Sequence, residues 1–400
     1  MSARAPKRSI QDLAMAGAEP LFARPRSTSS LVRPDFERFL AYSRKFHQAH
    51  QFTNNGPLVR ELEARLATFH GTAHCVSFCS GFWALVLAIR CLALPGRREV
   101  IMPSLTYRRM ADVASWAGLV PRFCEVDADS LGMTPALVEP LLNEDTALIL
   151  GVHPIVNCFD APGMEALARA RGVPLLIDAV ESVRETIGGR RVGGFGRAEV
   201  FSLHASKLLN GFEGGYLTTD DAELAGRLAL IRGFGFQGPD EVVELGMNAK
   251  LNEIHAAMAL AGLDQLEEQI ERNRALYLAY REALAAIPGL RLVAFDQSEA
   301  CGYKNILVEL LDDWPLDRAR TLSLLNAENV LARAYYAPPL HQRPYAYPVI
   351  AGPLPVTERL GERFLLLPCG HFVDAQDVAA IATLLHFLHT HADGLEGLPK

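Results

Sequence analysis

The chemistry available to this 400-residue chain centres on one lysine and one aspartate. Asp178 follows the apolar run 173–177, and Lys207 ends the stretch 201–207. An aldehyde cofactor such as pyridoxal phosphate needs an amine that holds it as a Schiff base and a carboxylate that keeps its pyridine nitrogen protonated. Lys207 and Asp178 fit these two roles.

Asp178 is expected at the carboxyl end of a central strand, where open α/β sheets place their ligand crevice. A buried carboxylate there needs a cationic or hydrogen-bonding partner, and a protonated pyridine supplies one. Taken alone, Asp178 could equally be a helix N-cap, and Lys207 could be a solvated loop lysine. The glycine-rich residues 208–215 predict a sharp bend after Lys207, in which its amine is desolvated and reactive.

A helix start offers a place for a phosphate group. Residues 80–82, Ser-Gly-Phe, precede an apolar helix predicted over 83–90. Backbone N–H groups at such a start, beside a residue without a side chain, bind anions without a basic side chain. Ser202 offers a hydroxyl to the same phosphate, and Tyr107 could stack on a cofactor ring. An ordinary Ser-Gly cap and a core or surface tyrosine are the alternatives.

Composition excludes several classes of partner. Charged residues make up 21% of the chain and the net charge is −7, so neither nucleic acid nor an anionic membrane is expected to bind. The seven cysteines are odd in number and lack CxxC or metal-ligand spacing, which predicts buried thiols in a reducing cytoplasm and no metal site. The GxGxxG match at 233–238 follows a predicted helix rather than a strand, so it predicts no dinucleotide site.

The pattern of apolar residues predicts an α/β fold. Short apolar runs at 99–102, 147–151 and 174–177 are bounded by Pro, Gly or acidic residues, as strands buried on both faces should be. Helical stretches such as 163–171 alternate with them. This alternation is typical of a domain with a mainly parallel sheet.

The chain divides into three predicted parts. Residues 1–45 form an N-terminal arm, which we expect to be mobile or to clasp a partner because it is punctuated by prolines. A large cofactor-binding domain spans 46–270, and a smaller α+β domain spans 271–400. The boundary falls in a long helix predicted over 251–287, which Pro288-Gly289 ends.

Taken together, these residues resemble the DegT/DnrJ/EryC1/StrS family of sugar aminotransferases, which are fold-type I pyridoxal phosphate enzymes. The matching motifs lie in the family's order at 53–57, Glu63, 80–81, 103–107, 178–179, 201–207, 213–215, 246–248 and 354–358. The resemblance implies a large domain with a mainly parallel seven-stranded sheet between layers of helices, and a smaller C-terminal α+β domain.

The resemblance also implies roles for individual residues. The cofactor would be bound by Gly81, Phe82, Tyr107, Asp178, Glu181, Ser202, Lys207 and Asn248. Lys207 and Asp178 would be catalytic, with Lys207 holding the cofactor and Asp178 pairing with its pyridine nitrogen. Asn248 would reach the phosphate of the neighbouring subunit, so a homodimer would be needed for activity. The reaction would move an amino group from glutamate or glutamine to a keto sugar carried on a nucleotide.

Several positions depart from the family pattern. Phe82 stands where a hydroxyl residue is usual, and Glu181 stands where histidine or glutamine is usual. A carboxylate beside the phenolate oxygen of the cofactor predicts either a raised pKa of Glu181 or a salt bridge. Arg108 and Arg109 could compensate Glu181, bind an acidic substrate group, or lie solvated on the surface. Together with His341 they are the candidate substrate-binding residues.

These departures leave two alternatives open. The enzyme could aminate a non-sugar ketone, such as a cyclitol or a natural-product intermediate, or catalyse another pyridoxal phosphate reaction. The chain could also be a non-catalytic regulatory protein with the same fold, although the retained Lys207 and Asp178 speak against it.

Overall fold

A computed structural model describes residues 3–28, 33–395 and 397–398. Its largest sheet has seven strands in the order β2 (His74–Phe78), β10 (Gly215–Thr219), β9 (Ala198–Ser202), β6 (Leu175–Asp178), β5 (Thr146–Val152), β3 (Glu99–Pro103) and β4 (Val120–Cys124). Strand β10 runs antiparallel to β2 and β9, and the other pairs are parallel. Strands β3, β5 and β6 lie where the apolar runs predict them. The α/β class and the mainly parallel seven-stranded sheet are therefore confirmed.

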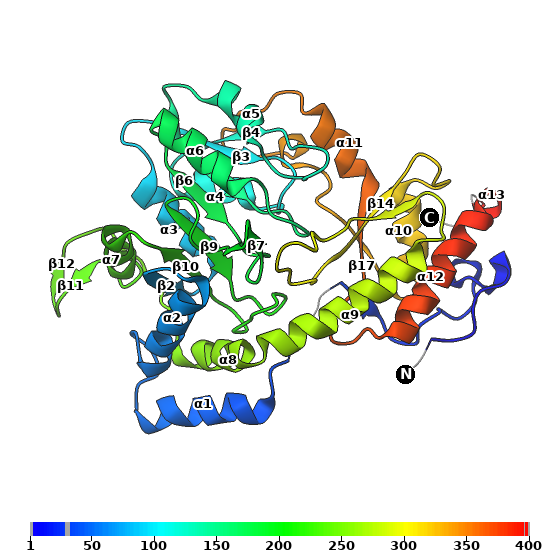
Figure 1. Ribbon diagram of the computed structural model, residues 1–400, viewed down its shortest axis with the longest axis horizontal. Helices are drawn as coiled ribbons and strands as arrows, with labels where there is room; N and C mark the ends of the chain where they lie inside the picture. Colours follow the sequence, from blue (N-terminus) through cyan, green and yellow to red (C-terminus); the bar gives the residue numbers. More distant parts are fainter. Residues whose placement is uncertain (1–2, 29–32, 396, 399–400) are drawn as a thin grey trace.

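Helices cover both faces of this sheet (Figure 1). The helices of this part of the chain are α1 (Phe36–Gln48), α2 (Pro57–His70), α3 (Gly81–Leu92), α4 (Met110–Trp116), α5 (Pro135–Val138), α6 (Ala161–Arg171), α7 (Ala222–Ile231) and α8 (Glu253–Asp264). Val100 and Met102 of β3 pack in a cluster with α3, α4 and α7, whereas Ile101 packs in another with α6. Because successive side chains of a strand point to opposite faces, a continuous apolar run is needed to fill both layers.

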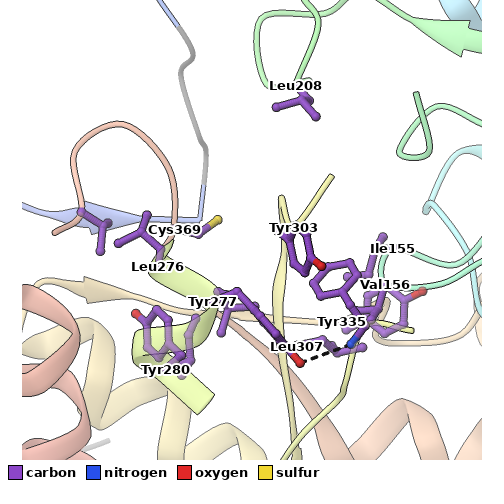
Figure 2. Packing of buried hydrophobic residues seen from close by; sticks show 14 of the residues in the cluster. Ile155, Val156, Leu208, Leu276, Tyr277, Tyr280, Tyr303, Leu307, Tyr335 and Cys369 are labelled. Atoms are coloured by element: carbon purple, nitrogen blue, oxygen red, sulfur yellow. Dashed lines mark hydrogen bonds between the residues drawn. The ribbon is translucent and has the colours of Figure 1, made fainter. Parts of the chain in front are cut away.

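A second sheet lies in the C-terminal part of the chain. Its strands follow the order β13 (Leu290–Leu292), β14 (Ile306–Leu310), β17 (Phe364–Leu367) and β16 (Arg333–Ala334), all antiparallel. Its helices are α9 (Leu266–Leu284), α10 (Arg318–Ala327), α11 (Pro355–Arg363), α12 (Ala375–Thr390) and α13 (Ala392–Leu395). Buried aromatic side chains such as Tyr277, Tyr280 and Tyr335 fill the space between them (Figure 2).

Helix α9 runs from the large sheet towards the second sheet (Figure 1). The single helix predicted over 251–287 is two helices, because α8 ends at Asp264 and Gln265 leaves helical geometry before α9 begins. The predicted domain boundary between residues 270 and 271 would fall inside α9, and the division into parts stays a prediction. Along residues 3–28, 33–395 and 397–398, none of the helices is both long and apolar enough to cross a membrane.

Residues 3–28 pack against the chain's own C-terminal part instead of forming a mobile arm, whereas contact with a partner stays a prediction. Leu13, Leu21 and Phe22 are buried, and strand β1 (Arg26–Ser27) pairs in parallel with β15 (Val330–Leu331) of the chain's own C-terminal part. Prolines alone do not keep a segment mobile when its apolar side chains find a core, because burial of each large apolar side chain is favourable by about 1.5–3 kcal/mol.

Glu328 fixes this N-terminal segment. Its buried carboxylate accepts hydrogen bonds from the backbone N–H groups of Ala14 (2.7 Å) and Leu21 (2.6 Å), and it pairs with Lys7 at 3.1 Å. The partners are distant in sequence and lie outside any recognisable motif, so the sequence gives no signal for the contact.

Replacing Glu328 with alanine should lower the free energy of unfolding by about 3 kcal/mol, because a buried cation and two buried N–H groups lose their acceptor. Chemical denaturation of the two proteins measures the difference. Glu19→Ala is the matched control, since Glu19 pairs with Arg4 (2.6 Å) on the surface with a side chain that is 79% exposed, and its loss should cost less than about 1 kcal/mol. Equal losses for the two variants would contradict the structural role of Glu328.

Candidate active site

Predicted cofactor residues converge on the carboxyl edge of the large sheet. Asp178 ends β6 and Ser202 ends β9, and these two strands are parallel neighbours. Lys207 lies on the loop that follows β9, and α3 begins at Gly81 soon after β2 ends. The sheet therefore brings to one edge the lysine, the aspartate and the helix start that the sequence singles out.

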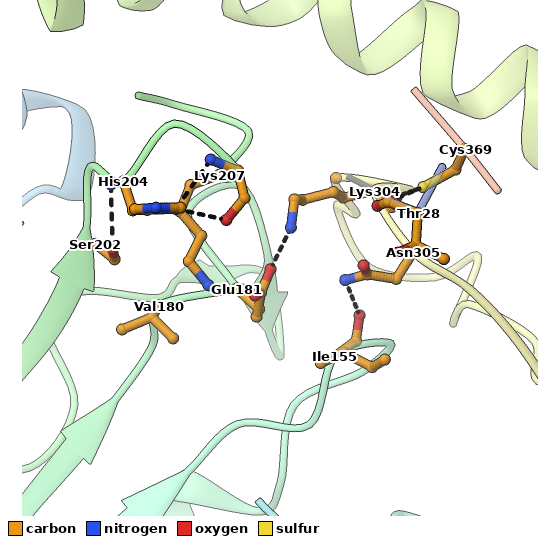
Figure 3. Close-up of polar contacts among 12 residues, drawn as sticks. Thr28, Ile155, Val180, Glu181, Ser202, His204, Lys207, Lys304, Asn305 and Cys369 are labelled. Carbon is orange, nitrogen blue, oxygen red and sulfur yellow. Dashed lines mark hydrogen bonds and ion pairs between the residues drawn. The ribbon is translucent and has the colours of Figure 1, made fainter. Parts of the chain in front are cut away.

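Lys207 and Glu181 form an ion pair at this edge. The second carboxylate oxygen of Glu181 pairs with Lys304, whose Nζ lies 2.7 Å away. Figure 3 shows Lys304 reaching Glu181 from the loop before β14, on the other side from Lys207. All three side chains are largely buried, with exposures of 16% for Lys207, 13% for Glu181 and 9% for Lys304.

The salt bridge predicted for Glu181 is therefore present, but two lysines make it instead of an arginine. Burial opposes ionisation of Glu181, yet the charges of Lys207 and Lys304 outweigh burial and lower its pKa to about 2. Arg109 instead pairs with Asp112 at 2.5 Å, and its side chain is 65% exposed. Arg108 is exposed as well. The suggestion that these arginines compensate Glu181 is corrected: Lys304 does so.

Asp178 is the most deeply buried carboxylate of the edge, with 1% exposure. Burial raises the pKa of its carboxyl to about 7 and nearby Glu181 adds to this, against the opposing effects of the Val180 N–H bond and Lys207. The hydrogen bond from Val180 measures 3.0 Å. A cation placed against this carboxylate would favour its ionised form, so Asp178 fits a protonated pyridine nitrogen.

The start of α3 forms a close-packed cradle with two neighbouring strands. A Cβ atom on Gly81 would lie 3.3 Å from Cβ of Ser202, and one on Gly215 would lie 2.3 Å from the Gly81 nitrogen. Ser80 caps the helix by accepting a hydrogen bond from the Trp83 N–H (3.3 Å). Backbone N–H groups at a helix start attract anions, so this cradle of small residues fits a phosphate group.

Phe82 does not replace the missing hydroxyl. Its ring contacts the Trp83 ring edge-on at a centroid distance of 5.5 Å, and Trp83 contacts Trp116 in the same way at 5.5 Å. The fit to a phosphate therefore depends on the helix start, Gly81 and Ser202 rather than on a second side chain.

Tyr336 lies near the carboxylates of the site, and Tyr107 lies near Tyr336. Tyr107 follows β3 and is 48% exposed. Tyr336 is not predicted by the sequence, yet burial raises the pKa of its phenol well above 10, and Tyr335, Glu181, Asp178 and Tyr107 add to the shift. Tyr336 adopts a positive φ of 42°, which is uncommon for a residue with a side chain.

His341 is held between two side chains. Its Nδ1 lies 2.6 Å from the Ser104 hydroxyl, and its Nε2 lies 3.0 Å from the Glu358 carboxylate. Ser104 follows β3, so the imidazole ties the large sheet to α11. A role in binding substrate stays a prediction for His341, as it does for Arg108 and Arg109.

Asn248 is exposed, and its side-chain oxygen accepts a hydrogen bond from Lys250 at 2.7 Å. It forms an isolated bridge with Gly233, just outside the hairpin of β11 (Phe236–Gln237) and β12 (Glu241–Val242). The GxGxxG match thus belongs to a hairpin rather than to a strand-to-helix turn.

The small hairpin of β7 (Thr186–Ile187) and β8 (Arg190–Arg191) lies elsewhere along the chain.

A mainly parallel sheet with a lysine, a buried aspartate and a glycine-lined helix start at one edge defines a fold-type I enzyme. The comparison with known proteins then identifies the family. The chain belongs to the DegT/DnrJ/EryC1/StrS aminotransferase family, which matches residues 35–386. It is therefore a transaminase of a family whose members depend on pyridoxal phosphate.

Relatives of known activity are similar over most of their length. The UDP-N-acetyl-3-dehydro-alpha-D-glucosamine 3-aminotransferase of Acidithiobacillus ferrooxidans is 32% identical over 82% of this chain and 87% of its own. The dTDP-4-amino-4,6-dideoxy-D-glucose transaminase of Escherichia coli is 26% identical over 88% of this chain and 95% of its own. The crystal structure of DesI in the presence of its TDP-sugar product is 35% identical, covers 97% of this chain and 99% of its own, and has a TM-score of 0.90.

Proposed function

We propose that this enzyme binds pyridoxal phosphate and transfers an amino group from glutamate or glutamine to a keto sugar carried on a nucleotide. The observation that carries the proposal is the convergence of Lys207, Glu181 and Asp178 at the carboxyl edge of the sheet. The nucleotide-sugar substrates in the names of the similar enzymes support the choice of substrate class.

Pyridoxal phosphate supplies an aldehyde that condenses with amines and a protonated ring that accepts electrons. Asp178 would hold the proton on the pyridine nitrogen, and the start of α3 with Gly81 and Ser202 would hold the phosphate. Lys207 Nζ would act as general base and acid: it would take a proton from the α-carbon of the amine donor and deliver it to the carbon that carried the cofactor aldehyde, and it would move a proton in the reverse direction when the keto acceptor is aminated. Tyr107 would stack on the cofactor ring.

We also propose that the enzyme acts as a homodimer. Apolar side chains between 43% and 72% exposed gather on and beside the β11–β12 hairpin: Phe234, Phe236, Val242, Val243 and Leu245. Asn248 follows them in sequence and is itself exposed. An exposed apolar patch of this kind marks an interaction surface. A second subunit that packs on this patch would lie next to Asn248. The free cysteines support the cytoplasmic location expected from the sequence.

Purified enzyme tests the substrate class directly. It is incubated with glutamate or glutamine and a panel of nucleotide-linked keto sugars, and product amine is detected by mass spectrometry. We expect amination of at least one sugar. Amination of none, by enzyme that binds pyridoxal phosphate, would favour a non-sugar ketone, the alternative that Phe82 and Glu181 motivate.

The cradle at Gly215 gives a second prediction. Gly215→Ala should weaken pyridoxal phosphate binding by about 5- to 150-fold, because a Cβ 2.3 Å from the Gly81 nitrogen must displace the start of α3, at a cost of about 1–3 kcal/mol. Cofactor titration followed by absorbance measures the affinity. Gly226→Ala is the control, since Gly226 lies within α7 with open space around it, and this change should leave affinity unaltered while stabilising the fold by about 1 kcal/mol. Unchanged affinity in Gly215→Ala would exclude the cradle as the phosphate site.

A further inference from the structure

Lys304 is the unexpected cation of the active site. It precedes β14 in the C-terminal part of the chain, whereas Lys207 and Glu181 belong to loops of the large sheet. Glu181 thus gives one oxygen to each lysine, with Lys304 Nζ at 2.7 Å. A single buried carboxylate shared by two ammonium groups holds each of them less strongly than it would hold one alone.

The backbone around Lys304 is fixed on both sides. The ring of Tyr303 lies 5.4 Å from the ring of Tyr277 (Figure 2) and 5.0 Å from the ring of Phe295, as centroid distances. The Cys369 thiol donates to the carbonyl of Lys304 (3.0 Å), and the Asn305 amide donates to the carbonyl of Ile155 (3.2 Å; Figure 3). These contacts hold the Lys304 side chain at Glu181 instead of leaving it to sample solvent.

The remaining titratable groups around this cluster are at most partly ionised at neutral pH. They are Asp178, Glu185, Tyr335, Tyr336 and Cys369. Burial raises the pKa of Asp178 and that of Glu185 to about 7, and it raises the pKa values of the phenols and the thiol. Among these acids and Glu181, Glu181 alone is fully ionised at neutral pH, and it faces two lysines.

We infer that Lys304 is a positioning residue for Lys207: by holding the second oxygen of Glu181 and repelling a neighbouring ammonium group, it keeps the Lys207 amine available for reaction with an aldehyde. A lysine is activated by a nearby cation because the cation disfavours its protonated form. Without Lys304, Glu181 would hold the Lys207 ammonium alone. The inference rests on the proposed function, in which Lys207 must react as a free amine.

Replacing Lys304 with methionine tests this without any substrate. Full-length enzyme freed of cofactor is treated briefly with acetic anhydride at neutral pH, and labelling of Lys207 is read by mass spectrometry against Lys45. Lys45 serves as the internal reference because its side chain is 54% exposed and pairs with Glu61 on the surface. We expect relative labelling of Lys207 to fall about tenfold in Lys304→Met, since removal of a cation that shares a carboxylate with an amine shifts the protonation equilibrium of that amine by about one order of magnitude.

Two further variants separate charge from packing. Lys304→Arg keeps the cation and should label like the wild type to within about threefold. Glu181→Gln removes the shared carboxylate and should raise labelling of Lys207, and adding Lys304→Met to it should cause a smaller fall than in the wild-type background. Circular dichroism shows whether Lys304→Met folds. If it does not fold, the inference is judged by whether labelling of Lys207 rises or falls in Glu181→Gln.

Unchanged labelling in folded Lys304→Met, an equal fall in Lys304→Arg, or no rise in Glu181→Gln would each overturn the inference. Failure of the proposed function has a different signature, because wild-type enzyme would then bind no pyridoxal phosphate or aminate no ketone. The labelling of Lys207 is measured without pyridoxal phosphate and without a ketone, so it does not depend on either result.

Discussion

Lys207→Ala should reduce turnover by about 10⁴-fold, the largest effect expected of any single substitution in this enzyme. The variant loses both the amine that holds the cofactor and the group that moves the proton. Turnover is measured with saturating amine donor and keto acceptor, and the absorbance of the bound cofactor is recorded in parallel. We expect the long-wavelength absorbance of the holoenzyme to be lost together with activity.

The fold should survive this change, because Glu181 keeps Lys304 as its partner at 2.7 Å. Loss of one ammonium therefore does not leave a buried carboxylate uncompensated. Lys45→Ala is the matched control, since it removes an exposed lysine that also pairs with a glutamate, and its turnover should stay within about twofold of the wild type. Retention of more than about 1% of turnover in Lys207→Ala would reject the assigned role.

Much of the site could be predicted because its residues follow strands that are themselves easily recognised. The runs that form β3, β5 and β6 are apolar on both faces, and the residue after such a run lies at the ligand edge of a parallel sheet. Asp178 and Ser202 end two adjacent strands, and Lys207 follows within one loop. The residues next to each strand are therefore enough to place these side chains at the site, and no information on distant segments is needed.

What the sequence does not predict depends on contacts between distant segments. Lys304 and Tyr336 come from the C-terminal part, where neither stands in a motif or after a strand that ends at the site. Glu328 likewise meets Ala14 and Leu21 across more than 300 positions of sequence. The pairing of charges in this site is a property of how two parts of the chain meet, so the unusual Glu181 predicts that a cation is needed but not which one.

The two acids at the centre of the site respond to pH in opposite ways. Glu181 has a lowered pKa of about 2, so its contribution to stability is present above its unfolded value of 4.5 and is lost as the pH falls towards 2. Asp178 has a raised pKa of about 7, so its contribution is full below its unfolded value of 3.8 and is lost as the pH rises through 7. In the cofactor-free protein, Asp178 is thus destabilising at the pH where the enzyme would work.

Asp178→Asn should separate these effects. An amide of the same shape cannot hold a proton on the pyridine nitrogen, and loss of a buried ion pair costs about 3–5 kcal/mol, which corresponds to about 10²- to 10⁴-fold in turnover. The cofactor-free variant should instead gain stability relative to the wild type as the pH rises from 4 to 8, because the wild-type carboxylate must ionise in a buried site. Turnover and denaturant unfolding across this pH range measure the two expectations.

The opposite signs of the two effects make Asp178→Asn a sharper test than a loss of activity alone. A variant damaged in its packing would lose both turnover and stability. Removal of a buried carboxylate whose ionisation is unfavourable instead lowers turnover and raises stability in the cofactor-free state. Asp129→Asn, at an exposed position, is the control and should change neither by more than about 0.5 kcal/mol. If Asp178→Asn turned over at the wild-type rate, the carboxylate would not serve the pyridine nitrogen. If its stability tracked that of the wild type at every pH, Asp178 would not be the buried acid that titrates near neutrality.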